Sequence, residues 1–213
     1  TLKDMHEYFR DRTPTEKNQY TGMFQGKNLL LFTGEAFWIG AVNEQYTPTL
    51  YKLAHSGFVF ENFYNPLWYY STVDGEYAAT TGLIPTNQVN ASQRYAGKNG
   101  VSMYFSMGNQ LRALGYPTLA YHNNTANYYD RNLSHPNLGY DFYACDTGLD
   151  VAMTWPQSDL EMMQLTLPQA LAGEKPFHNY YMTVSGHMNY SFAGNAMSAK
   201  HRDEVADLDM SEA

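Results

Sequence analysis

Residues 26–37 have the sequence GKNLLLFTGEAF, in which a continuous apolar run lies between Gly26 and Gly34. A short apolar run bounded by turn residues is typical of a buried strand, so residues 27–33 are predicted to form one. Glu35 follows this strand directly. Open α/β sheets bind ligands outside the carboxyl ends of their strands, which makes Glu35 a candidate site residue. The alternative role for this carboxylate is a helix N-cap or first-turn acid.

Outward from this strand, helix and strand signals alternate. A helix should begin after Thr47, where Pro48 occupies the first helical position and Gly57 follows the end. Ser158 and Glu161 form a capping box that opens another helix, which Pro168 is expected to kink or divide. Sequence pattern predicts further strands at 58–63, 117–121 and 177–184 and a helix at 107–114. The charged residues of 201–213 indicate a solvated helix. This alternation predicts an α/β fold.

Composition excludes several classes of protein. The 213 residues are 44% hydrophobic, which is enough for one substantial core, and the net charge of −8 makes nucleic acid an improbable partner. A single cysteine, Cys145, rules out an internal disulfide framework and a thiolate zinc cluster. No apolar stretch approaches the roughly 20 residues of a membrane span. The first 18 residues are polar, so we expect any export signal or anchor to have been removed or to lie upstream.

Two further candidates follow from position. His187 comes just after the strand predicted at 177–184, so it should meet Glu35 at one edge of the sheet, although a lone histidine is more often structural. Thr72 precedes Asp74 and Glu76, acids that suit the first turn of a helix. A hydroxyl there faces backbone N–H groups that favour anions, and it becomes a nucleophile if a metal or base lowers its pKa. The alternative role for Thr72 is a helix cap.

A polar cluster follows the strand predicted at 117–121 and contains His122, Asn124, Tyr129 and Arg131. Arg131 could bind a phosphate in a bidentate manner, and His122 and Asn124 could bind its ester oxygens or a hydroxyl. The alternative is an ordinary polar loop.

The order and spacing of these clusters resemble those of a known family. The resemblance spans nearly the whole chain and rests on the following segments: TEKNQYTG (15–22), GKNL (26–29), Glu35, TPTL (47–50), FENFY (60–64), STVDGE (71–76), LGYD (138–141) and SGH (185–187). The chain resembles the extracellular catalytic domain of the lipoteichoic acid synthases, in the sulfatase and alkaline-phosphatase-like superfamily. The resemblance implies an α/β central sheet flanked by helices and incomplete at the C-terminus. Residues 1–25 would be a juxtamembrane-like segment and residues 26–213 the N-terminal part of the catalytic domain.

The resemblance also implies roles for single residues. Glu35 would ligate a divalent metal, Mn²⁺ or Mg²⁺, and Thr72 would be both metal ligand and catalytic nucleophile. The remaining five would bind substrate: His122, Asn124, Tyr129, Arg131 and His187. The family usually has Asp at the position of Asn124 and Trp at that of Tyr129. The Cys/Ser-x-Pro-x-Arg motif of sulfatases is absent around Thr72, which argues against sulfatase activity.

The implied activity is a phosphoglycerol transfer from phosphatidylglycerol to a growing polymer through a Thr72-bound intermediate. It would take place at the extracellular face of the cell membrane, with the anchor upstream. His187 would serve as catalytic acid or base, and Arg131 and His122 would offset charge on the phosphoryl oxygens. Two other functions stay open: a phosphodiesterase or phosphatase of the same superfamily, and a non-catalytic module that binds glycerol-phosphate polymers, which the acidic charge disfavours.

One expected feature is missing from the sequence. The family completes its metal site with an Asp-His pair on a later strand, and this sequence contains no Asp-His dipeptide. The helix predicted at 201–213 also stops without Gly or Pro, which indicates a chain cut within a helix, or else a frayed natural end. We therefore expect this chain to be a fragment with little activity of its own.

Overall fold

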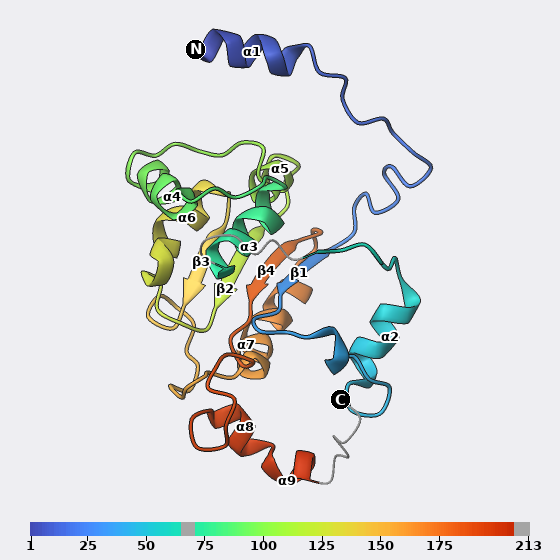
Figure 1. Cartoon of the computed structure of the whole chain (residues 1–213), viewed down its shortest axis with the longest axis vertical. Coiled ribbons are helices and arrows are strands. Elements are labelled where there is room, and N and C mark those ends of the chain that lie inside the picture. The colour runs from blue at the N-terminus through green and yellow to red at the C-terminus, as the bar shows by residue number, and fades with distance from the viewer. Residues whose placement is uncertain (65–70, 207–213) are drawn as a thin grey trace.

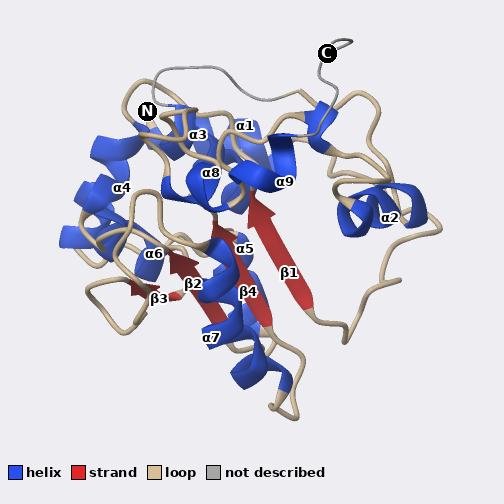
Figure 2. Ribbon diagram, turned by 90° about the horizontal axis from the view of Figure 1, so that it is seen from below, coloured by secondary structure: helices blue, strands red, loops and turns tan. Residues whose placement is uncertain are grey.

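The computed structural model describes residues 1–64 and 71–206 of the chain, and its centre is a parallel sheet with helices on both faces (Figures 1 and 2). Its strands are β1 (Leu29–Thr33), β2 (Thr118–His122), β3 (Asp141–Ala144) and β4 (His178–Met182), arranged in the order β1-β4-β2-β3. Every pairing is parallel, so the carboxyl ends of the strands lie along one edge. The predicted α/β class is confirmed.

The described helices are, in chain order, α1 (Leu2–Arg10), η1 (Ile39–Ala41), α2 (Pro48–Ser56), α3 (Ser71–Thr81), α4 (Val89–Lys98), α5 (Met107–Ala113), η2 (Tyr128–Asp130), α6 (Arg131–Asn137), α7 (Asp159–Leu171), α8 (Ala196–Lys200) and α9 (Arg202–Ala206). Figure 1 shows α1 standing apart from the sheet. Among the described residues no helix is both long and apolar enough to cross a membrane.

Two cores form because successive side chains of β4 point to opposite faces of the sheet. On one face Tyr180 packs with Tyr140 and Leu138, and α3 and α6 reach this face through contacts of their own side chains with Tyr180. On the other face Tyr181 packs with Met162 of α7.

The α7 face also carries a ladder of aromatic rings, one from each strand. Tyr143 stacks on Tyr121, Tyr121 on Tyr181, and Tyr181 on Phe32, with ring centroids 5.6, 5.1 and 5.3 Å apart. The strand register places these side chains opposite one another, so the ladder holds the four strands in line.

The strand predicted at 58–63 is wrong. Residues 58–60 have no regular structure, and Glu61 and Asn62 form a turn. The Phe58 ring packs edge-on against Tyr20 and Phe24, with centroids 5.0 and 6.3 Å apart. Alternating aromatics are not sufficient for a strand, because a strand also needs a hydrogen-bonding neighbour, and no described strand pairs with this segment.

Other predicted elements are confirmed with changes in detail. The strand predicted at 27–33 is β1, but it is not buried: it lies at an edge of the sheet, and its Leu30 and Phe32 side chains are exposed. The helix after Thr47 is α2, but the Thr47 hydroxyl donates to the Ala41 carbonyl instead of capping it. The helix after Ser158 is α7, which continues past Pro168 undivided. Ser158 accepts from the Glu161 N–H, but the other half of the capping box is not formed: the Glu161 carboxylate accepts from the Ala152 N–H.

The helix predicted at 201–213 corresponds to α9 over Arg202–Ala206. His201 lies in the turn before it, and residues 207–213 lie outside the described part of the chain.

Candidate active site

A pocket opens at the carboxyl edge of the sheet. It is lined by all seven residues singled out from the sequence, together with five others: Glu35, Thr72, His122, Asn124, Tyr128, Tyr129, Arg131, Trp155, Met182, Thr183, Val184 and His187. Glu35 follows β1, Thr72 lies in the first turn of α3, His122 ends β2, and His187 follows β4. Because the strands are parallel, residues more than 100 positions apart meet at one rim.

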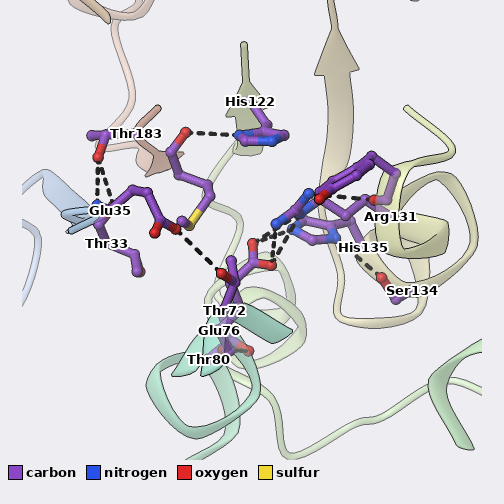
Figure 3. Close-up of polar contacts among 12 residues, drawn as sticks. Thr33, Glu35, Thr72, Glu76, Thr80, His122, Arg131, Ser134, His135 and Thr183 are labelled. Carbon is purple, nitrogen blue, oxygen red and sulfur yellow. Dashed lines mark hydrogen bonds and ion pairs between the residues drawn. The ribbon is translucent and has the colours of Figure 1, made fainter. Parts of the chain in front are cut away.

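Glu35 and Thr72 are in direct contact (Figure 3). The Thr72 hydroxyl donates to Glu35 Oε2 across 3.2 Å. The Glu35 backbone N–H donates to the Thr183 hydroxyl at 2.8 Å, which ties the end of β1 to the end of β4. A Cβ on Gly186 would lie 2.7 Å from the Glu35 carbonyl oxygen, so glycine is what allows this close approach. No helix begins at Glu35, and the alternative role as a helix-terminal acid is wrong.

The backbone around the pocket is strained. Ala36, next to Glu35, has a φ of +51°, and Tyr129 and Asp130 have φ values of +57° and +55°. Left-handed conformations at non-glycine residues cost about 1–3 kcal/mol each and concentrate at functional sites. The turn at Tyr129 and Asp130 leads directly into α6, so it places the Tyr129 and Arg131 side chains on the pocket wall.

His122 is a neutral hydrogen-bond acceptor on its pocket side. Its ring is buried, and Nδ1 lies 3.0 Å from the Met182 carbonyl oxygen, to which it can only donate. Burial and the positive charge of Arg131 lower the pKa of His122 to about 4. The proton therefore stays on Nδ1 at neutral pH and Nε2 carries a lone pair. The expectation that His122 offsets negative charge on a phosphoryl group stays a prediction, and it would require the bound phosphate to raise the pKa of this buried ring.

Asn124 and His187 each have one polar atom occupied. Asn124 Oδ1 accepts from the Thr125 N–H at 2.7 Å, which leaves its amide N–H groups to face a ligand. His187 Nδ1 lies 3.2 Å from the Met188 carbonyl oxygen, and the ring packs edge-on against Trp155 with centroids 5.2 Å apart. The Trp155 indole N–H donates to the same Met188 carbonyl at 3.1 Å. Trp155 thus holds the His187 ring on the rim of the pocket.

Arg131 is fully buried and already has an anionic partner. Its Nε and Nη2 donate to Glu76 at 3.0 and 2.7 Å, and Nη1 donates to the Tyr128 carbonyl at 3.3 Å. Burial opposes ionisation of Glu76, but the positive charge of Arg131 and contacts with His135 outweigh it and hold the pKa of Glu76 far below its usual range. The guanidinium predicted to bind phosphate in a bidentate manner is therefore engaged in a bidentate contact inside the protein.

Sequence reasoning missed Glu76 and Trp155 as parts of this region. Glu76 was expected to be only a helix-terminal acid, and nothing in the sequence pairs it with Arg131, 55 positions away. Trp155 lies in the loop before α7, where no spacing pattern connects it to His187.

The described residues hold no cluster of three or more His, Cys, Asp or Glu side chains suited to a metal ion. Glu35 and Thr72 nevertheless place two oxygen donors side by side. Although Glu35 and Thr72 contact each other, both side chains still line the pocket.

Comparison with known proteins identifies the family. The sulfatase family profile matches residues 27–207, which is most of the chain. This chain belongs to the sulfatase family. The sheet described above is therefore that of a sulfatase-family protein. The resemblance seen in the sequence is confirmed.

Two relatives of this sulfatase-family chain are lipoteichoic acid synthases. It is 23% identical over 204 residues to lipoteichoic acid synthase 2 of Bacillus subtilis (strain 168), covering 89% of this chain and 30% of that protein. It superimposes on the crystal structure of the lipoteichoic acid synthase LtaP from Listeria monocytogenes with a TM-score of 0.72 and 23% identity, over 88% of this chain and 48% of the other.

A third, more distant match is a protein of the alkaline phosphatase superfamily from Vibrio parahaemolyticus. Its TM-score is 0.60 at 23% identity, over 78% of this chain and 42% of the other. The chain spans less than a third of the length of its curated relative and about half of the solved structures. These structures establish the fold of this sulfatase-family member.

Proposed function

We propose that the chain is part of a metal-dependent phosphoglycerol transferase of the lipoteichoic acid synthase type, with Thr72 as nucleophile. The observation that carries the proposal is the 3.2 Å contact between the Thr72 hydroxyl and the Glu35 carboxylate at the mouth of a pocket. The relatives named as lipoteichoic acid synthases support the reaction class.

The geometry of Glu35 and Thr72 suits a shared cation. Adjacent oxygen ligands of an octahedral ion, bound at about 2.1 Å, lie about 3.0 Å apart, close to the separation of these two oxygens. Carboxylate and hydroxyl oxygens favour a hard ion such as Mg²⁺ or Mn²⁺. Such an ion would lower the pKa of the Thr72 hydroxyl and offset charge on a phosphoryl oxygen. We propose that its remaining ligands, an Asp-His pair, belong to a part of the protein beyond this chain, and that the chain alone has little activity.

The side chains of the pocket account for the remaining steps. The Thr72 hydroxyl releases its proton to solvent, its oxygen bonds to the phosphorus of phosphatidylglycerol, and the bond between phosphorus and the diacylglycerol oxygen breaks. Protonated His187 gives the diacylglycerol oxygen a proton. It then takes one from the glycerol hydroxyl of the acceptor polymer, whose oxygen bonds to phosphorus while the bond from phosphorus to the Thr72 oxygen breaks and that oxygen regains a proton from solvent. His122 Nε2 accepts a hydrogen bond from a hydroxyl of the bound glycerol, and Asn124 donates to an ester oxygen.

Substrate and location follow from the same proposal. The lipid donor requires access to a membrane surface, so we propose that the whole protein acts at the extracellular face of the cell membrane through an anchor upstream of this chain. Tyr128 and Tyr129, with ring centroids 4.5 Å apart, offer apolar surface beside the phosphate position.

Replacing Thr72 tests the proposal. In the longest reading frame that contains this chain, Thr72→Ala should lower diacylglycerol release from fluorescent phosphatidylglycerol by about 10⁴-fold or more. Mass spectrometry should find a glycerophosphate adduct on the parent peptide that contains Thr72 and none on the variant. The matched control is Thr81→Ala on the same helix, where the hydroxyl donates to the Tyr77 carbonyl outside the pocket.

Unchanged release by Thr72→Ala would refute the nucleophile. If the glycerophosphate leaves the protein only onto water, even with glycerol polymer present, the protein is a hydrolase and not a transferase.

A further inference from the structure

Helix α3 places a second functional side chain directly below the nucleophile. Glu76 lies four residues after Thr72, so the two side chains share one face of the helix a single turn apart. Thr72 reaches the pocket, whereas the Glu76 side chain is only 8% exposed. The carboxylate therefore lies under the site, within the protein (Figure 3).

Donors from two other elements converge on this carboxylate. Arg131 Nε and Nη2 donate to it, the Tyr180 hydroxyl lies 3.1 Å from Oε1, and His135 Nε2 lies 3.6 Å from Oε1. The Tyr180 hydroxyl is also 3.1 Å from the hydroxyl of Thr33, the last residue of β1. An ionised acceptor takes the stronger hydrogen bond, so Tyr180 donates to Glu76. The network joins α3, α6 and β4, and through Thr33 the strand that ends beside Glu35.

The same network limits what Arg131 can offer a ligand. A guanidinium has five N–H groups in one plane. Hydrogen bonds to Glu76 and to the Tyr128 carbonyl account for Nε–H, one Nη2–H and one Nη1–H. One N–H on each terminal nitrogen is left, and the plane of both is set by Glu76. The Arg131 guanidinium thus lines the pocket in an orientation that its contact with Glu76 fixes.

We propose that Glu76 is a positioning residue, which fixes the Arg131 guanidinium so that its remaining Nη1–H and Nη2–H bind the phosphate group of the substrate. This inference rests on the proposed function for the identity of that ligand. Glu76 itself touches no substrate. It acts through Arg131, and it balances a charge that burial would otherwise make very costly.

The first test observes Arg131 without any ligand. In the 213-residue chain, the Nε–H resonance of Arg131 is assigned by ¹⁵N NMR with Arg131→Lys as reference. The parent should show a slowly exchanging signal, and Glu76→Gln should shift it and speed its exchange at least tenfold. The matched control is Asp141→Asn, which removes the carboxylate of an exposed arginine pair with Arg112. An Arg131 signal with unchanged shift and exchange in Glu76→Gln overturns the proposal.

The second test measures binding of sn-glycerol 3-phosphate by titration calorimetry. Glu76→Gln should weaken binding at least tenfold, and the same change in an Arg131→Ala background should alter it less than twofold, because Glu76 acts only through Arg131. A purely structural Glu76 would lower the melting temperature and leave the affinity of the folded protein within twofold of the parent, which refutes positioning.

The two tests separate the inference from the proposed function. If the parent does not bind glycerol phosphate, the proposed function fails, and the Arg131 resonance still decides whether Glu76 positions it. If Glu76→Gln does not fold, Glu76→Asp keeps the charge but withdraws the carboxylate by one methylene. It should then move the Arg131 signal and weaken binding at least fivefold, and no change in either measurement contradicts the proposal.

Discussion

Two arginine–carboxylate pairs in this chain have nearly the same N···O distance, but one is buried and the other is exposed. Arg131 Nη2 lies 2.7 Å from Glu76, and the two side chains are 2% and 8% exposed. Arg112 Nη2 lies 2.8 Å from Asp141, and those side chains are 45% and 61% exposed. Distance therefore does not distinguish the inner pair, under the pocket, from the outer pair, on the surface between α5 and β3. Solvent does.

Desolvation explains why the pairs should behave differently. Water screens the outer pair, and the Arg112 guanidinium also donates to the Thr118 hydroxyl at 3.0 Å, so loss of Asp141 leaves it with a partner and with water. Arg131 would keep its hydrogen bond to the Tyr128 carbonyl, but its side chain is buried, so water cannot solvate the charge once Glu76 is lost. We therefore expect the Arg131–Glu76 pair to be held in one arrangement, which the proposed positioning of the guanidinium requires.

The largest expected effect is on the inner pair. Glu76→Ala should lower the free energy of unfolding by about 3–5 kcal/mol, because it leaves Arg131 charged and buried without its partner. Urea unfolding followed by circular dichroism measures this loss. A loss below about 1 kcal/mol would mean that the buried pair stabilises the protein no more than an exposed pair, which would contradict the comparison.

A smaller effect should appear in the pH dependence of the inner region. The pKa of His122 is lowered from 6.5 to about 4, so the unfolded chain binds a proton on this residue between these values and the folded chain does not. The free energy of unfolding should therefore fall as the pH drops from about 6.5 to 4, by up to about 3 kcal/mol from this group.

The histidine contribution is isolated by comparing variants. His122→Gln should show a shallower fall of the unfolding free energy between pH 7 and pH 4.5 than the parent, and His201→Gln, at an exposed histidine, serves as the control. Parallel pH profiles for the parent and His122→Gln would show that His122 is not held neutral.

The smallest effect belongs to the outer pair. Asp141→Asn should change the free energy of unfolding by less than about 1 kcal/mol, and 0.5 M NaCl should remove most of that difference by screening. The same salt should hardly change the loss caused by Glu76→Ala. A loss of several kcal/mol at Asp141 would mean that surface exposure fails to predict the strength of these pairs.

Several site residues could be predicted because local signals and topology suffice for them. An apolar run followed by Glu35, and a second strand followed by His187, place both residues at one edge once the strands are parallel. The acids that follow Thr72 mark it as the start of a helix, and the resemblance of the STVDGE segment to the lipoteichoic acid synthases pairs it with Glu35, which its hydroxyl does contact. The metal, substrate and catalytic roles of these residues stay predictions.

Other features could not be predicted because they depend on distant partners. Glu76 has the appearance of a helix-terminal acid until Arg131 is folded against it, and His122 has the appearance of a cation until burial is known. The segment 58–63 shows the opposite error: its alternating aromatics suggested a strand, but the fold provides it no described neighbour to pair with.

The sequence by itself determined the α/β class, three of the four described strands, several helices, and which residue types gather at the carboxyl edge, since these follow from short-range spacing and from the parallel order of strands. Only the tertiary structure decided the states of those residues: which arginine is paired, which histidine is neutral, and which carboxylate lies under the pocket instead of in it. The physical reason is that charge and protonation depend on burial and on partners far away in the chain, and neither exists until the chain has folded.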